Sequence, residues 1–280
     1  GVGKGDAGLT DRDPNVNAWD DIKDKAWESR RMETYAAMVD SMDQGIGKIL
    51  DSLKRNDVFD DTLIVFLSDN GGCAEELKPW WSLLGLGGSG ARKHTKSGKK
   101  ITFGNTKKAM AGPEETFQSC GQAWANLSNA PFRLYKHWTH EGGIATPFIV
   151  HWPNGIQKKG AIRRNIAQLP DVMATILDIT GFQYPKTYKG NEIHPLEGTS
   201  MLPLFQGEDN GKKRLFFEHE GNGCVRGEKW KLVRDFPFDW ELYDIQRDPT
   251  ELHNVVNDYP EVASEMINAY EKWAKRVGVL

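Results

Sequence analysis

The sequence is poor in cysteine, in net charge and in long apolar runs, and each shortage argues against a class of protein. Its three cysteines, Cys73, Cys120 and Cys224, are too widely spaced for a paired metal motif or a disulfide framework, and their odd number leaves at least one thiol free. No stretch approaches the roughly 18 consecutive apolar residues of a membrane-spanning helix. A net charge of −3 argues against nucleic-acid binding as the main function. The composition is otherwise that of an ordinary globular protein.

The most informative segment is an apolar run that ends in polar residues and glycines. Residues 63–67 are all apolar, which predicts a strand buried on both faces, because a half-buried strand would alternate. Asp69 and Asn70 follow at its carboxyl end, where ligands bind in open α/β sheets. Their carboxylate and carboxamide oxygens are hard donors of the kind that bind calcium or magnesium. Together with Gly71 and Gly72, the same residues are equally typical of a simple turn.

Helical and strand-like patterns alternate along the first two thirds of the chain, which predicts an α/β fold. We expect residues 1–208 to form an α/β domain with a mixed, mostly parallel central sheet flanked by helices. Short strand-like runs then predict a small antiparallel sheet with a closing helix, a separate α+β subdomain over residues 209–280. Residues 73–131 lack a sustained pattern and are expected to form functional loops or an insertion. The expected elements are helices at residues 28–55, 169–179 and 260–277 and strands at residues 62–67 and 146–152.

Seven segments of the chain are distinctive when taken together. They are YAAMVDSMD (35–43), LSDNGG (67–72), FRLYKHWTHEGG (132–143), PFIVHWP (147–153), EHEGN (218–222), WKLV (230–233), and ELYD (241–244) with DPTELHN (248–254). In order and spacing, from about residue 15 to the end, they resemble the sulfatase family, a branch of the alkaline-phosphatase-like superfamily, with bacterial arylsulfatases as the most similar members. The resemblance rests on all seven segments occurring in register, since no single one is decisive.

The resemblance implies hydrolysis of a sulfate ester to an alcohol and inorganic sulfate. It implies one bound calcium ion with Asp69 and Asn70 among its ligands. It also implies that Lys136 contacts the sulfate and assists the leaving oxygen. Physical chemistry is consistent with both roles, because a divalent cation and an ammonium stabilise negative charge on a departing oxygen where water is excluded.

The candidates for substrate binding are His140, His219 and Arg92. The two histidines lie in family-like segments, and histidine carries protons readily near neutral pH. Arg92 belongs to residues 89–108, which contain no acidic residue. We hypothesise that this basic segment helps to hold a sulfated glycan rather than only a small sulfated molecule. The alternative is that residues 89–108 form a mobile, solvated loop. The basic residues of this segment are Arg92, Lys93, Lys96, Lys99, Lys100, Lys107 and Lys108.

The sequence also departs from the family pattern. Sulfatases convert a cysteine or serine in a Cys/Ser-x-Pro-Ser/Ala-Arg motif to formylglycine, and this chain has no such motif. The family's earlier Asp-Asp metal pair and upstream histidine are absent too, since no histidine precedes His94. We therefore interpret the chain as the carboxy-terminal portion of a sulfatase, with the amino-terminal half of the same protein as its partner.

The chain by itself supplies only part of the ligands that a calcium ion needs. Calcium binds about six to eight oxygens, of which Asp69 and Asn70 supply two or three. We expect the chain alone to bind calcium weakly and to hydrolyse nothing. The family resemblance further implies a periplasmic or secreted protein.

Two alternatives remain open. A phosphodiesterase or phosphonate hydrolase of the same superfamily would share the fold, but such enzymes usually bind transition metals through more aspartates and histidines. The sparse pair Asp69 and Asn70 favours calcium and a sulfate ester. A non-catalytic, glycan-binding remnant is the second alternative, and it predicts that the parent gene encodes no nucleophile motif.

Overall fold

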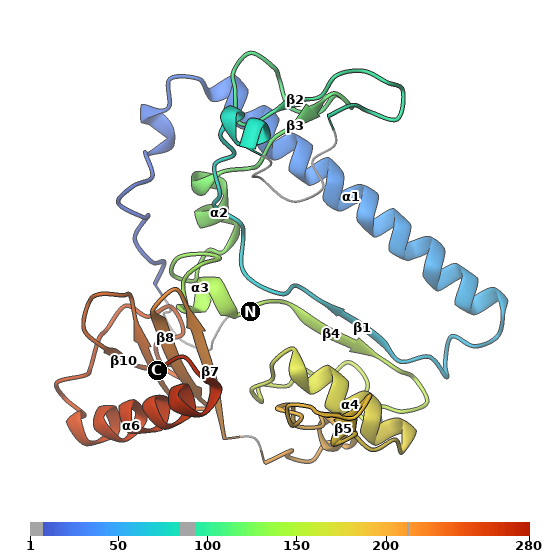
Figure 1. Ribbon diagram of the computed structural model, residues 1–280, viewed down its shortest axis with the longest axis vertical. Helices are drawn as coiled ribbons and strands as arrows, with labels where there is room; N and C mark the ends of the chain where they lie inside the picture. Colours follow the sequence, from blue (N-terminus) through green and yellow to red (C-terminus); the bar gives the residue numbers. More distant parts are fainter. Residues whose placement is uncertain (1–7, 85–92, 212) are drawn as a thin grey trace. The chain divides into compact units, whose positions relative to one another are not determined.

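The computed structural model describes residues 8–84, 93–211 and 213–280, which form two compact units (Figure 1). The first unit joins Gly8, Asp57–Asp69 and Thr146–Leu280, and the second joins Leu9–Asn56 and Asn70–Ala145. The expected boundary between residues 208 and 209 lies inside the first unit, and as a domain boundary it stays a prediction.

The second unit is built on the long helix α1 (Lys25–Arg55). The helix begins where the Asp24 carboxylate accepts a hydrogen bond from the backbone N–H of Trp27, which satisfies one of the free donors of the first turn. Trp27 and Arg31 are buried, but apolar side chains farther along the helix are exposed, with Met38 at 66% and Ile49 at 62% exposure. The expected helix over residues 28–55 is confirmed, and its fully buried residues lie in its first turns.

The rest of the second unit consists of short elements. β2 and β3 pair in parallel, and the rings of Phe103 and Phe117 stack with their centroids 5.4 Å apart. Residues 73–131, expected as loops or an insertion, thus contain short pieces of regular structure. The elements are the 3₁₀ helices η1 (Trp19–Asp21) and η2 (Pro79–Leu84), the strands β2 (Thr102–Phe103) and β3 (Thr116–Phe117), and the helices α2 (Gln122–Ser128) and α3 (Glu141–Ile144).

In the first unit, β1 (Ile64–Leu67) pairs with β4 (Phe148–His151). The two strands are antiparallel, with Phe66 opposite Ile149, so this part of the central sheet does not show the expected parallel direction. Val150 packs against the cluster formed by Met201 and neighbouring apolar residues. Phe66 and Ile149, in contrast, are 38% and 58% exposed. The prediction of burial on both faces is therefore wrong for this pair, because several of its side chains remain exposed.

Three further elements complete this part of the first unit. α4 (Pro170–Thr180) begins with proline, whose missing N–H costs nothing in the first turn, and ends at Gly181 in the left-handed conformation with φ of 72°. The predicted helix at residues 169–179 is confirmed within one residue. The other elements are α5 (Leu202–Gln206) and the antiparallel pair β5 (Thr187–Tyr188) and β6 (Asn191–Glu192).

The carboxy-terminal part of the first unit is a four-stranded antiparallel sheet covered by one helix (Figure 1). Val225, Leu232 and Leu242 project from the sheet into a core shared with Met266 and Tyr270 of that helix. The sheet order is β10-β9-β8-β7, a simple meander. Both the sheet and the closing helix are confirmed. The elements are β7 (Arg214–His219), β8 (Asn222–Gly227), β9 (Trp230–Arg234), β10 (Glu241–Asp244) and α6 (Pro260–Val277).

The described residues therefore form a mixed α/β structure with a small antiparallel carboxy-terminal sheet, and the predicted fold class is confirmed. None of the helices that the described residues form has the length and apolar character needed to cross a bilayer.

Candidate functional site

The segment that follows Asn70 passes directly against helix α3. The backbone N–H of Gly71 donates to the carbonyl of Gly143 at 3.0 Å. A β-carbon on Gly71 would lie 1.9 Å from the carbonyl oxygen of Gly142, so no other residue fits without a backbone shift. Gly71, Gly142 and Gly143 thus allow a close crossing of two backbone segments, which is a structural role.

Lys136 is fixed to the same segment through its backbone. Its N–H donates to the carbonyl of Gly72 at 3.1 Å, two residues after Asn70. The preceding side chain, Tyr135, is buried and donates its hydroxyl to the Asp13 carboxylate at 2.6 Å. The pKa of Tyr135 is raised to about 12, mainly by burial and to a smaller extent by this hydrogen bond. The tyrosine therefore stays protonated near neutral pH and anchors the chain next to Lys136.

The side chain of Lys136 contacts two residues of the loop after Gly72. Its Nζ lies 2.8 Å from Oε1 of Glu75 and 4.0 Å from Sγ of Cys73. The hydrogen bond from Lys136 lowers the pKa of Glu75 and, with the positive charge of Lys136, outweighs the opposing effect of burial. The carboxylate is therefore ionised near neutral pH. The side chain of Lys136 is 37% exposed.

Asp69 and Asn70 lie at the end of β1, as the sequence predicts, and Asp69 is exposed. The Asn70 side chain donates from Nδ2 to the carbonyl of Gly71 at 2.9 Å, which orients the amide group. A carboxylate and an amide oxygen suit calcium, but they are too few to enclose it, because calcium binds about six to eight oxygens. Their role as metal ligands stays a prediction.

His140 precedes α3 and is completely buried. Its carbonyl accepts the backbone N–H groups of Gly143 and Ile144 at 2.8 and 3.3 Å, so the residue helps to form the turn. Burial favours a structural role, and substrate binding by His140 stays a prediction. Arg92, the other candidate from that part of the sequence, lies outside the described residues.

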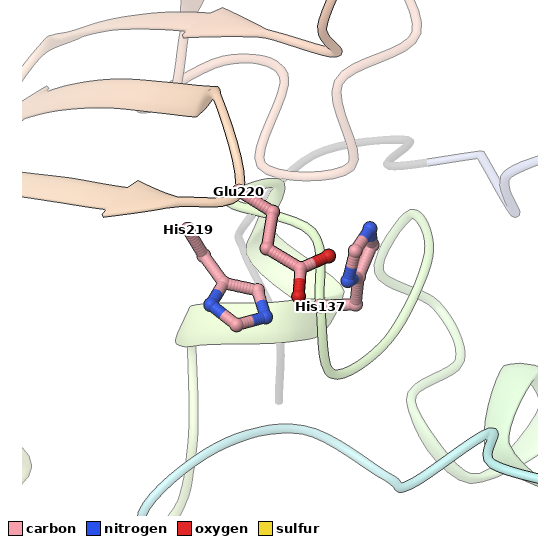
Figure 2. Close-up of side chains that lie close together, drawn as sticks. All are labelled: His137, His219 and Glu220. Carbon is pink, nitrogen blue, oxygen red and sulfur yellow. The ribbon is translucent and has the colours of Figure 1, made fainter.

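His219 and Glu220 lie where β7 turns into β8, in the first unit, and both are exposed (Figure 2). Glu220 adopts a positive φ of 53° and Gly221 one of 91°, as a tight turn requires. Substrate binding by His219 stays a prediction. Glu220 stands in the same sequence motif, EHEGN at residues 218–222, and its place in the turn beside His219 is evident only in the structure. His137, also labelled in Figure 2, belongs to the second unit.

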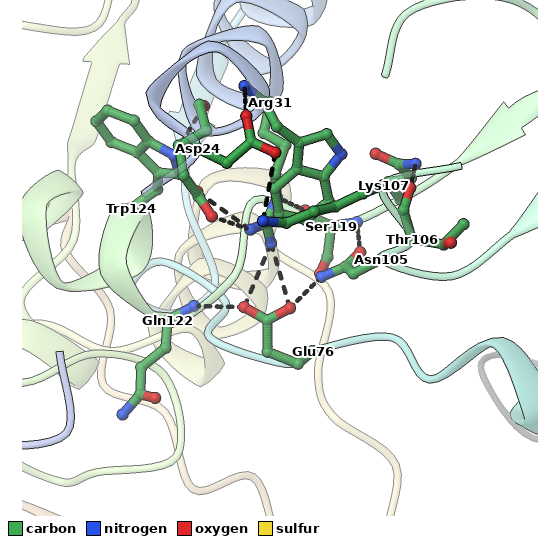
Figure 3. A network of polar contacts seen from close by, with 12 residues as sticks. Asp24, Arg31, Glu76, Asn105, Thr106, Lys107, Ser119, Gln122 and Trp124 are labelled. Atoms are coloured by element: carbon green, nitrogen blue, oxygen red, sulfur yellow. Dashed lines mark hydrogen bonds and ion pairs between the residues drawn. The ribbon is translucent and has the colours of Figure 1, made fainter. Parts of the chain in front are cut away.

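A buried arginine organises the loops of the second unit (Figure 3). Arg31, 5% exposed, contacts both carboxylate oxygens of Glu28 at 3.1 Å and both of Glu76 at 3.3 Å, and donates to the Ser119 carbonyl at 3.0 Å. Glu76 also accepts hydrogen bonds from Asn105 and from the backbone of Gln122. Sequence periodicity does not predict this network, because its partners lie as far as 88 positions apart in the chain.

The Gly71 crossing gives a stability test. We expect Gly71→Ala to lower the free energy of unfolding by about 1–3 kcal/mol, because the new methyl group must displace backbone atoms of α3. Gly45→Ala is the matched control. A β-carbon there has nothing within 4 Å, and alanine stabilises a helix interior by about 0.5–1 kcal/mol. Urea unfolding followed by circular dichroism measures both; equal midpoints for Gly71→Ala and the unmodified chain would contradict the crossing.

Comparison with known proteins identifies the family. The family profile named Sulfatase matches residues 7–182, and the profile for the carboxy-terminal part of N-sulphoglucosamine sulphohydrolase matches residues 132–276. An uncharacterised sulfatase of Schizosaccharomyces pombe is 30% identical, over 95% of this chain and 47% of its own length. An arylsulfatase of Klebsiella aerogenes is 31% identical, over 65% of this chain and 38% of its own length.

Solved structures agree with the fold. The crystal structure of Ps i-CgsB superimposes with a TM-score of 0.61 at 25% identity, covering 93% of this chain and 44% of that one. A phosphonate monoester hydrolase of Agrobacterium radiobacter has the same fold, with a TM-score of 0.51 at 20% identity over 88% of this chain and 41% of that one. The fold alone therefore does not select the ester that is cleaved.

The chain belongs to the sulfatase family, since the Sulfatase profile covers more than half of it. It spans less than half of the length of the curated relatives described above.

Proposed function

We propose that the protein containing this chain hydrolyses sulfate esters to an alcohol and inorganic sulfate. Membership of the sulfatase family supports the class of reaction. The observation that carries the proposal is the attachment of Lys136 to the segment after Asn70, through the hydrogen bond to the Gly72 carbonyl at 3.1 Å. The candidate catalytic lysine and a candidate metal ligand thereby belong to one small region of the second unit.

In this mechanism the Lys136 ammonium binds a sulfate oxygen and stabilises the negative charge that grows on the leaving oxygen. Such preorganised charge is worth about 100- to 1000-fold in rate when water is excluded. Asp69 and Asn70 would hold calcium, which supplies further positive charge against the sulfate. The family resemblance implies a formylglycine nucleophile, and we assign that role to no residue of this chain.

We place the protein among the arylsulfatase-like members, in the periplasm or outside the cell, acting on a sulfated small molecule or a sulfated glycan. The basic segment at residues 93–108 supports a polyanionic substrate through its charge alone. By itself, the chain is expected to bind calcium weakly and to hydrolyse nothing.

Paired substrates test the reaction class in the product of the complete gene. We expect it to hydrolyse 4-nitrophenyl sulfate and to lose this activity when calcium is removed by EGTA, with recovery on addition of calcium but not of magnesium. Substituting Asp69→Ala together with Asn70→Ala should weaken calcium binding in calorimetry, because two oxygen ligands are lost.

The phosphonate monoester hydrolase that shares the fold makes phosphonate ester hydrolysis the second candidate function. A faster turnover of 4-nitrophenyl phenylphosphonate than of the sulfate ester, with dependence on a transition metal, would replace our proposal by this one. A complete gene product that cleaves neither ester would favour the non-catalytic, glycan-binding alternative.

A further inference from the structure

We propose that Glu75 is a positioning residue for Lys136, holding the lysine ammonium in the place where it meets the substrate's sulfate. The inference rests on the proposed function, in which Lys136 contacts that sulfate. Glu75 lies outside the seven segments that resemble sulfatases.

The geometry of the pair is fixed at both backbones. On one side, the N–H of Lys136 donates to the Gly72 carbonyl at 3.1 Å. On the other, the Ser119 hydroxyl donates to the Glu75 carbonyl at 2.5 Å. Between these anchors the side chains meet, with Nζ of Lys136 at 2.8 Å from Oε1 of Glu75. The contact therefore joins two segments that are already held in place.

The anchor of Glu75 belongs to the buried network around Arg31 (Figure 3). Ser119 accepts a hydrogen bond from Asn105 at 2.9 Å, and its backbone carbonyl accepts one from Arg31 at 3.0 Å. The next residue in the chain, Glu76, is bound to the same arginine. The adjacent glutamates thus have different tasks: Glu76 holds the loop to the network, and Glu75 extends from that loop to Lys136.

The ion pair between Lys136 and Glu75 can position the lysine while adding little to the stability of the fold. Lysine has about 2 kcal/mol of side-chain rotamer entropy, so each ion pair that its ammonium makes narrows the range of positions that it samples. The side chains of Lys136 and Glu75 are 37% and 59% exposed, and exposed ion pairs add only about 0–1 kcal/mol to stability. Removal of the Glu75 charge should therefore change where Lys136 lies without unfolding the protein.

The test is a double-mutant cycle in the product of the complete gene, assayed with 4-nitrophenyl sulfate. We expect Glu75→Gln to lower kcat/KM by three- to tenfold with an unchanged urea midpoint. In a Lys136→Ala background, Glu75→Gln should have no further effect, because the group that it positions is absent. Glu114→Gln is the matched control, because it alters an exposed glutamate of the same unit that bonds to Ser97, and it should leave kcat/KM unchanged.

A second readout needs no activity. Carbon-13 NMR titration of the 280-residue chain should show the pKa of Glu75 rising towards its ordinary value in Lys136→Met, because the hydrogen bond that lowers this pKa is lost. An unchanged Glu75 pKa, or equal losses from Glu75→Gln with and without Lys136, would overturn the inference. If Lys136→Ala itself left kcat/KM intact, the proposed role of Lys136 in the reaction would fail instead.

Discussion

Lys231→Met is expected to lower the free energy of unfolding by about 3–5 kcal/mol, the usual cost of leaving one buried charge without its partner. Lys231 lies in β9 and its Nζ is 2.8 Å from Oε1 of Glu251, and both side chains are 0% exposed. Methionine has a similar length, so the loss reports the charge rather than a cavity. Urea unfolding of the chain, followed by circular dichroism, measures the change.

Two further variants test whether the loss of stability in Lys231→Met comes from the unpaired buried charge. A double variant, Lys231→Met with Glu251→Leu, should recover most of the stability, because an apolar pair of similar volume replaces the ion pair. Arg30→Met breaks a pair with Glu33 whose side chains are 52% and 61% exposed, and should change the free energy by less than about 1 kcal/mol. A loss below 1 kcal/mol for Lys231→Met would show that water reaches the pair.

The second large effect concerns activity. In the product of the complete gene, Lys136→Ala is expected to lower kcat for 4-nitrophenyl sulfate by about 100- to 1000-fold, which corresponds to about 2.7–4 kcal/mol of lost transition-state stabilisation. The loss is expected because, in the proposed mechanism, the Lys136 ammonium stabilises the negative charge on the leaving oxygen. Initial-rate kinetics measure the change, and the urea midpoint should stay the same because Lys136 is 37% exposed.

Two further variants make this result specific. Lys136→Arg keeps the charge but presents it on a planar fork, so it should retain part of the activity. Lys78→Ala removes an exposed lysine of the same unit and should have no effect. If Lys136→Ala were as active as Lys78→Ala, the assignment of Lys136 to the reaction would be wrong.

The sequence predicted local structure well where an apolar pattern met clear end signals. The closing helix at residues 260–277 begins at a proline and is followed by Gly278 with φ of 81°, and the structure reproduces its bounds. The buried strand at residues 62–67 was predicted less well. The strand exists as predicted, but its partner is antiparallel and Phe66 is 38% exposed. A continuous apolar run shows that a strand forms, and it does not specify the neighbour.

The candidate site divides in the same way. Lys136, Asp69 and Asn70 could be predicted as site residues because they stand in motifs that resemble the family. Glu75 could not be predicted, since it lies in an irregular loop and contacts Lys136 across 61 positions of the chain. The same holds for the buried pair of Lys231 and Glu251, since a pattern of hydrophobicity contains no signal that two charges will be buried together.

The sequence by itself determined the helices, the carboxy-terminal sheet, the family and the residue types at the candidate site. Only the tertiary structure decided which polar groups meet: the Gly71 crossing with α3, the network around Arg31, and the ammonium of Lys136 beside Glu75. The reason is the range of the forces involved. Periodicity and end signals act within a few residues, whereas hydrogen bonds and ion pairs join whichever groups the folded backbone brings within about 3 Å.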